Sequence, residues 1–150
     1  MDFPLAARLT LQDMEAGRSH SFETAITGVD IDRFAALSGD FSPLHMDEQF
    51  ARSRGFAGRV VHGAYLAGLA SQMVGMHLPG ENCLLHSFQM KFAKPVICGS
   101  SVRVTGTVDQ LSEATHAAVI IVTVTDLASG ETLATGKAVI GITEPRAGGS

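Results

Sequence analysis

Asp40 and His45 place a carboxylate and an imidazole five residues apart, in the segment FAALSGDFSPLH that ends at His45. An imidazole titrates near neutral pH, and a carboxylate beside it can exchange protons with the same substrate or water. Gly39 lets the chain turn and Pro43 fixes one backbone dihedral angle, so the loop is expected to be rigid. The spacing fits a general acid–base pair. It also fits a plainer interpretation, in which Asp40 caps the following helix and His45 is a polar residue near its start.

A second segment with chemical potential is RVVHG, which ends at Gly63 and precedes a long apolar run. The first backbone N–H groups of a helix have no partner within the helix and carry partial positive charge. Gly63 would let a ligand oxygen approach such a bare N–H, which can stabilise negative charge developing on a carbonyl. Alternatively, Gly63 only makes the helix start permissive, and the His62 side chain is hydrogen-bonded to a backbone carbonyl. Taken together, residues 40–63 offer an acid–base pair and an oxyanion donor.

No other catalytic apparatus competes with these two segments. The sequence contains no glycine-rich phosphate loop, no GxSxG motif and no cluster with metal-ligand spacing. Its two cysteines, Cys83 and Cys98, form neither a CxxC pair nor part of a zinc pattern. The sequence therefore predicts a site that uses no metal and no cofactor, in the reducing environment of the cytoplasm.

Helices are expected to position the two segments in the first half of the chain, after a strand at 20–27. Asp30 is typical of a helix N-cap and Gly39 of the left-handed residue that ends a helix, so one helix is predicted between them. A short helix is predicted at 46–53, which leaves the candidate pair on a loop between two helices. The run at 63–76 is apolar on nearly all sides, which is typical of a helix enclosed by protein on most sides.

Strands dominate the second half of the chain. Alternating or β-branched runs predict strands at 84–93, 101–110, 117–125 and 131–142, with a tight turn at 128–130 before the last. Their order along the chain favours an antiparallel meander. The expected fold class is α+β, in which a twisted antiparallel sheet is wrapped around one long central helix.

Composition limits the kinds of partner. Of the 150 residues, 45% are hydrophobic and 17% charged, which is typical of a globular domain. We expect a single domain over 1–150, with an ordered core at about 10–142 and a flexible C-terminal tail. A net charge of −4 without any basic block argues against nucleic acid and anionic membrane surfaces as partners. The sequence lacks a signal peptide or a membrane-spanning stretch, so a cytoplasmic location is predicted.

The two segments together resemble a known signature. The residues LSGDFSPLH at 37–45, Phe50-Ala51 and GFAGRVVHG at 55–63 resemble the hydratase-2 signature of the MaoC-like dehydratase family, which includes the (R)-specific enoyl-CoA hydratases. The resemblance covers residues 10–142. It implies a hot-dog fold and a homodimer, or a higher homo-oligomer, with acyl-CoA at the subunit interface. It also implies a hydro-lyase that reversibly hydrates a trans-2-enoyl thioester to the (R)-3-hydroxyacyl thioester.

The resemblance also assigns roles to individual residues. Asp40 and His45 match the catalytic pair, and Gly63 matches the residue whose backbone N–H binds the thioester carbonyl. Ser71, two turns along the same helix, matches a position that can help to organise the active site. His62 and Ser42 are further candidates for supporting it. Ser42 stands where the family has Asn; a serine can make a similar but weaker side-chain contact to the backbone, so the loop is expected to survive.

Two rival functions remain open on the same fold. A thioesterase would use the same oxyanion donor, but water would attack the thioester carbonyl carbon and release a free thiol. A non-catalytic acyl-CoA binding module would need no acid–base pair, so the presence of Asp40 and His45 argues against it.

Overall fold

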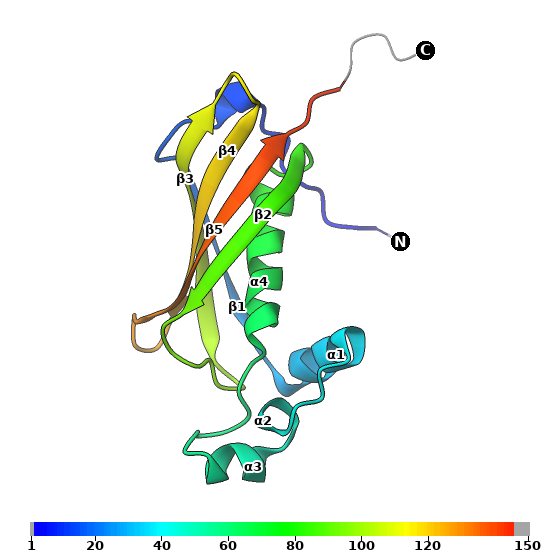
Figure 1. Cartoon of the computed structure of the whole chain (residues 1–150), viewed down its shortest axis with the longest axis vertical. Helices are drawn as coiled ribbons and strands as arrows, with labels where there is room; N and C mark the ends of the chain where they lie inside the picture. The colour runs from blue at the N-terminus through cyan, green and yellow to red at the C-terminus, as the bar shows by residue number, and fades with distance from the viewer. Residues whose placement is uncertain (1, 146–150) are drawn as a thin grey trace.

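The computed structural model describes residues 2–145, whose main feature is a five-stranded antiparallel sheet curved around one helix (Figure 1). The strands are β1 (Ser19–Ala25), β2 (Cys83–Phe92), β3 (Ser101–Ser112), β4 (Ala117–Asp126) and β5 (Thr132–Ile142). Each predicted strand is present, and Gly130 takes the positive φ of 75° that the predicted turn requires. The α+β hot-dog architecture expected from the sequence is thereby confirmed.

The order of the strands departs from the predicted meander. The sheet order is β1-β3-β4-β5-β2, so β2 pairs with β5 at the far edge and not with its successor β3. The connection after β2 is drawn away by the segment before the central helix, because Val96 O accepts from Val61 N–H and Arg59 O accepts from Cys98 N–H. The chain therefore passes the start of the central helix before it rejoins the sheet. The meander is correct only for β3, β4 and β5.

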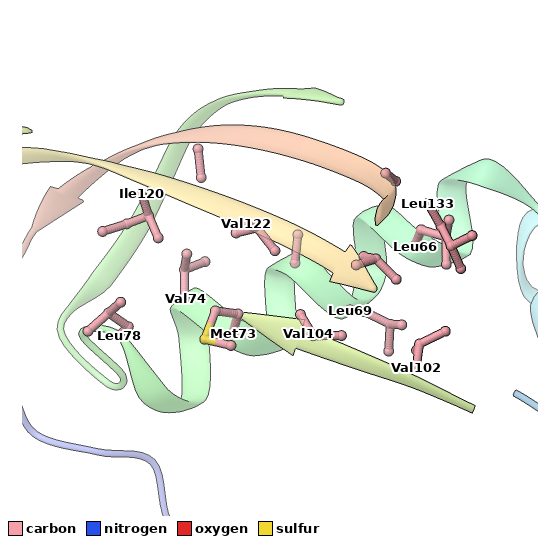
Figure 2. Packing of buried hydrophobic residues seen from close by; sticks show 14 of the residues in the cluster. Leu66, Leu69, Met73, Val74, Leu78, Val102, Val104, Ile120, Val122 and Leu133 are labelled. Carbon is pink, nitrogen blue, oxygen red and sulfur yellow. The ribbon is translucent and has the colours of Figure 1, made fainter. Parts of the chain in front are cut away.

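The central helix α4 (Gly63–Gln72) runs on into a π-helical turn, η2 (Met73–His77), and ends before Pro79 as predicted. Its inward side packs on the concave face of the sheet (Figure 2). The buried residues in this contact include Leu66, Leu69, Met73 and Val74 from the helix and Val104, Ile120 and Val122 from the strands. Alternate strand residues face this core, because successive side chains of a strand point to opposite faces.

The opposite side of α4 is not covered by the described chain. Ala64, Gly68, Ser71 and Gln72 are exposed, at spacings that place them along one side of the helix. The prediction that protein encloses the helix on most sides is therefore wrong for a single chain. The concave face of the sheet covers one side of α4, and the described chain has no second layer to cover the other side.

Three helices lie together beyond the N-terminal end of α4 (Figure 1). They are α1 (Gly28–Ser38), α2 (Pro43–Met46) and α3 (Glu48–Ser53), and a short 3-10 helix, η1 (Leu11–Asp13), precedes β1. Gly39 ends α1 in the left-handed conformation, with φ of 79°, as predicted. Asp30 is not the N-cap, however. Thr27 caps the helix, and Asp30 at the third helical position accepts back from the Thr27 N–H to complete a capping box.

The helix predicted at 46–53 is divided in two. Asp47 interrupts it, because its carboxylate accepts from Phe50 N–H at 3.1 Å and starts α3 anew. Consequently His45 lies within the one-turn helix α2 and not on a loop. Among residues 2–145, no helix is long and apolar enough to cross a membrane. The predicted flexible tail falls largely on residues 146–150, which lie outside the described part of the chain.

Candidate active site

Asp40 and His45 face each other across a short gap. Asp40 follows the C-terminal glycine of α1, His45 lies in α2, and Asp40 Oδ2 is 3.8 Å from His45 Nε2. This distance is too long for a direct hydrogen bond and short enough for one water molecule to contact both atoms. The carboxylate is half exposed, at 51%, whereas the imidazole is mostly buried, at 15%. The pair is thus open to solvent or substrate from the side of Asp40.

The ring of His45 is fixed by a backbone carbonyl. Its Nδ1 lies 2.6 Å from Val60 O, which can only accept a hydrogen bond, so Nδ1 carries the proton. In the neutral imidazole the other nitrogen, Nε2, then carries a lone pair. It is this lone pair that faces the Asp40 carboxylate, and the arrangement suits a group that accepts a proton.

The carboxylate of Asp40 has a different partner on each oxygen, so it contacts the start of α2 and faces His45 at the same time. Oδ1 accepts from Ser42 N–H at 3.1 Å and so shapes the start of α2, while Oδ2 faces His45. Ser42 contributes its backbone only: its side chain makes no cap hydrogen bond, and its carbonyl accepts from His45 N–H at 2.9 Å. The turn contact expected from the Ser42 side chain is therefore wrong, since the Asp40 carboxylate already occupies that role.

Residues 59 and 60 hold the α2 turn in place. Val60 N–H donates to Leu44 O, and the Arg59 guanidinium donates both to His45 O and to the Asp32 carboxylate on α1. The Arg59 side chain is only 18% exposed, so it acts as an internal clamp. Together with the Val60 carbonyl on the His45 ring, these contacts from two adjacent residues fix the α2 backbone and the ring of His45.

Gly63 is the first residue of α4, where backbone N–H groups have no partner within the helix. The side chain of the preceding N-cap residue, His62, makes no cap hydrogen bond to them. Beside Gly63 lies a mostly apolar cavity of about 330 Å³, whose lining includes His45, Leu66 and Phe92. A larger hollow of about 600 Å³ is lined only by residues 12–13 and 15–18 and contains neither an imidazole nor a thiol. We therefore place the candidate site at the cavity beside Gly63.

His62 lies behind the pair and contacts both of its members. It is 1% exposed, its Nε2 lies 2.9 Å from Asp40 O, and its ring stacks on that of His45 with centroids 4.0 Å apart. The expected hydrogen bond to a backbone carbonyl is thus present. The other ring nitrogen, Nδ1, is buried and has no hydrogen-bond partner within the described residues.

Asp40, His45 and His62 also form the type of cluster that can bind a metal ion, since one donor atom from each lies within 4.8 Å of the others. The two rings are, however, nearly parallel, with an angle of 27° between their planes. Metal ligation requires both nitrogen lone pairs to converge on the ion within the ring planes, which stacked rings do not allow without movement. The geometry is better suited to proton transfer than to metal binding.

Ser71 does not join this cluster. It lies on the exposed side of α4, eight residues after Gly63 and therefore about 12 Å further along the helix axis. Conversely, sequence reasoning missed Arg59, the Val60 carbonyl and Phe92. Of these three, only Phe92 could have been found from the sequence, because it is an apolar residue in a predicted strand. The roles of Arg59 and of the Val60 carbonyl depend on tertiary contacts.

Comparison with known proteins places these features in a family. A family model described as "MaoC like domain" matches residues 11–132. The chain is 36% identical over 96 residues to a 3-hydroxybutyryl-CoA dehydratase from Methylorubrum extorquens, covering 64% of this chain and 61% of that protein. It is 37% identical over 100 residues to an (R)-specific enoyl-CoA hydratase from Rhodospirillum rubrum, covering 67% and 69%. The matched regions are thus only part of each relative.

Solved structures agree with the sequence comparisons. An (R)-hydratase from A. caviae involved in PHA biosynthesis superposes with a TM-score of 0.83 at 32% identity, covering 87% of this chain and 98% of that one. An unliganded R-hydratase from Pseudomonas aeruginosa gives a TM-score of 0.87 at 26% identity, with coverages of 93% and 89%. Because the family model spans most of the chain and the fold agrees, this chain belongs to the family of MaoC-like domain proteins.

Proposed function

We propose that this chain is a hydro-lyase that reversibly hydrates a trans-2-enoyl thioester to the (R)-3-hydroxyacyl thioester. The observation that carries the proposal is the gap of 3.8 Å between Asp40 Oδ2 and the lone pair of His45 Nε2. One water molecule held there contacts two proton acceptors at once. The names of the relatives, which are (R)-specific enoyl-CoA hydratases and a 3-hydroxybutyryl-CoA dehydratase, support the same reaction.

The proposed reaction proceeds in one balanced addition. The thioester carbonyl accepts a hydrogen bond from Gly63 N–H, which stabilises the enolate-like oxygen as negative charge develops. Water held between Asp40 and His45 forms a bond to C3 and gives up a proton to the pair, while the C2–C3 double bond becomes a single bond. The pair delivers one proton to C2, so the site ends in the protonation state in which it began.

The acyl group and the assembly are part of the same proposal. The acyl chain enters the cavity beside Gly63, whose lining is mostly apolar. A second copy of the chain covers the open side of α4, so that the enzyme is a homodimer or a higher homo-oligomer. The reaction needs no cofactor beyond the CoA or carrier-protein thioester of the substrate itself, and we place the enzyme in the cytoplasm.

The deciding experiment follows the enoyl absorbance of crotonyl-CoA and of a longer enoyl-CoA, with the wild type, Asp40→Asn and Asp109→Asn. The wild type is expected to consume the enoyl signal. Asp40→Asn should reduce the rate by roughly 10²–10⁴-fold, the usual contribution of a general acid or base. Asp109 is an exposed carboxylate on β3, so Asp109→Asn serves as the matched control and should retain full activity. Near-wild-type hydration by Asp40→Asn would contradict the mechanism.

The same preparation distinguishes the rival reaction. Saturated acyl-CoA is added together with a thiol reagent, because a thioesterase releases free CoA whereas a hydratase leaves the thioester intact. Thiol release without loss of the enoyl signal would replace the proposed hydratase by a thioesterase. An (R)-specific dehydrogenase coupled to the product then reports the configuration at C3.

A further inference from the structure

His62 is an unusual residue to bury. In the part of the chain that the structure describes, it is the one polar or charged side chain that is fully buried, at 1% exposure. Burying a polar group costs free energy unless hydrogen bonds compensate, and His62 satisfies only one of its two ring nitrogens. An apolar ring could fill the same space without an unsatisfied nitrogen. The imidazole therefore supplies something that an apolar ring cannot.

The hydrogen bond of His62 determines its tautomer. Asp40 O can only accept, so the Nε2 that lies 2.9 Å from it carries the proton. Nδ1 is buried and faces no partner among the described residues. The Nε2–H group of His62 is thus directed at the backbone of Asp40.

The ring of His62 also restrains His45. Their centroids are 4.0 Å apart and their planes are inclined by 27°, so His45 has an aromatic face against its own face. Val60 O holds the Nδ1 edge of the same ring. The His62 ring in turn packs against Phe34, with ring centroids 4.8 Å apart. Rotation of His45 out of the plane that directs Nε2 towards Asp40 would break the stacking.

We propose that His62 is a positioning residue that fixes the distance between the two members of the acid–base pair, an inference that rests on the proposed hydratase function. Its N–H group anchors the backbone of Asp40, and its face anchors the ring of His45. One rigid side chain therefore maintains the gap of one water molecule between Oδ2 and Nε2. His62 itself does not line the cavity beside Gly63.

The test compares two variants that separate these two contacts. His62→Phe retains an aromatic face but loses the N–H group, whereas His62→Gln places an amide donor near the position of Nε2 but loses the face. Misplacing a catalytic group by about 1 Å can cost on the order of 10²-fold in rate. We expect His62→Phe to lower kcat by about this factor with KM nearly unchanged. The kcat of His62→Gln should be higher than that of His62→Phe, because the amide replaces the lost donor.

A buried substitution can also act through stability alone. Val122→Ala, in the core contact between β4 and α4, serves as the matched control, because it is expected to lower Tm without a selective loss of kcat. If His62→Phe is folded and retains wild-type kcat in an enzyme that hydrates enoyl-CoA, the inference is wrong. If the wild type is inert, the proposed function is wrong, and a second readout decides the inference.

That second readout is the ¹⁵N spectrum of histidine-labelled protein, which reports tautomers without any substrate. The expected wild-type spectrum has His45 protonated at Nδ1 and His62 protonated at Nε2. In His62→Gln, which loses the aromatic face, His45 is expected to change to a mixture of tautomers, because its ring loses one restraint on its orientation. An unchanged His45 signal in His62→Gln, or a wild-type His62 protonated at Nδ1, would overturn the inference.

Discussion

At the scale of single residues, Gly63 is important because it has no Cβ atom. A Cβ added there would lie 3.0 Å from Phe92 Cζ and 3.3–3.4 Å from two further ring atoms. The Phe92 ring thus lies directly against the residue whose N–H group is proposed to bind the thioester carbonyl. Glycine allows both an apolar ring and a substrate oxygen to approach the same short stretch of backbone.

Gly63→Ala is therefore expected to act on turnover more than on stability. The Phe92 ring is half exposed, at 53%, so it can move by the few tenths of an ångström that the methyl group requires. Such movement narrows the entrance beside the N–H group, and kcat/KM should fall by at least tenfold, or about 1.4 kcal/mol. Steady-state kinetics with crotonyl-CoA measure the effect.

The double variant Gly63→Ala/Phe92→Leu identifies the cause. A leucine leaves room for the new methyl group, so the double variant should recover activity relative to Gly63→Ala, with Phe92→Leu alone as the control. Recovery would assign the loss to the clash with Phe92. A double variant as impaired as Gly63→Ala would show instead that the methyl group itself blocks the substrate oxygen.

The sequence predicted the side chains of this site better than their supports. Asp40 and His45 could be selected because the carboxylate and the imidazole are themselves the chemical groups, and the rigid loop between Gly39 and Pro43 brings them together. Val60 could not be selected, since its contribution is a backbone carbonyl that every residue carries. The clamp formed by Arg59 joins positions 27 residues apart, which local spacing does not reveal.

At the scale of elements, the junction between the end of the central helix and β1 contains two stacked histidines. The rings of His20 and His77 have centroids 4.3 Å apart, and Phe22 lies 5.5 Å from His77. Burial, and to a lesser extent the neighbouring His20, lowers the pKa of His77 below its usual value of 6.5. The π-helical turn therefore packs on β1 most favourably while His77 is neutral.

This lowered pKa makes the stability of the fold depend on pH. In the unfolded chain His77 binds a proton at higher pH than in the folded one, so the free energy of unfolding falls as the pH drops from about 7 through 6.5 and below. His77→Phe removes this proton uptake and should lose less stability over the same range. Urea unfolding at pH 8, 6.5 and 5 measures the difference.

A control variant tests the assignment to His77. His116 is an exposed histidine in the turn before β4, where its φ is 49°, so His116→Asn tests whether removal of any histidine has the same effect. It should retain the wild-type pH dependence. A His77→Phe variant whose stability changes with pH in parallel with the wild type would contradict the assignment to His77.

Secondary structure was predicted more accurately than connectivity. The limits of β3, β4 and β5 follow from the alternation of apolar and polar residues, because one face of the sheet is buried against α4. The place of β2 at the far edge follows from hydrogen bonds between residues 59–61 and 96–98, which no local pattern encodes. The Asp30 error is similar: Thr27 and Asp30 are both good capping residues, and only the geometry shows which of them is the cap.

At the scale of the whole molecule, a single chain leaves two apolar surfaces uncovered near the site. Leu37 is 85% exposed and Phe41 is 60% exposed, on either side of Asp40 in the sequence. The open side of α4 adds Ala64 and Gly68, whose small size allows another backbone to come close. Exposed apolar surface of this kind marks an interaction site more often than free surface. These features support the proposed homodimer.

Gly68→Gln tests the homodimer at a position where the chain itself imposes no constraint. A Cβ at Gly68 meets no atom within 4 Å, and replacing a mid-helix glycine normally stabilises a helix by about 0.5–1 kcal/mol. If a second copy packs on this side of α4, the glutamine instead obstructs it. Light scattering should then give about twice 15.7 kDa for the wild type and a mass shifted towards 15.7 kDa for Gly68→Gln.

Ala128→Gln, in the exposed turn between β4 and β5, is the control and should remain dimeric. A dimeric Gly68→Gln with raised Tm would mean that this side of the helix stays open in the assembly, and that the subunits meet elsewhere.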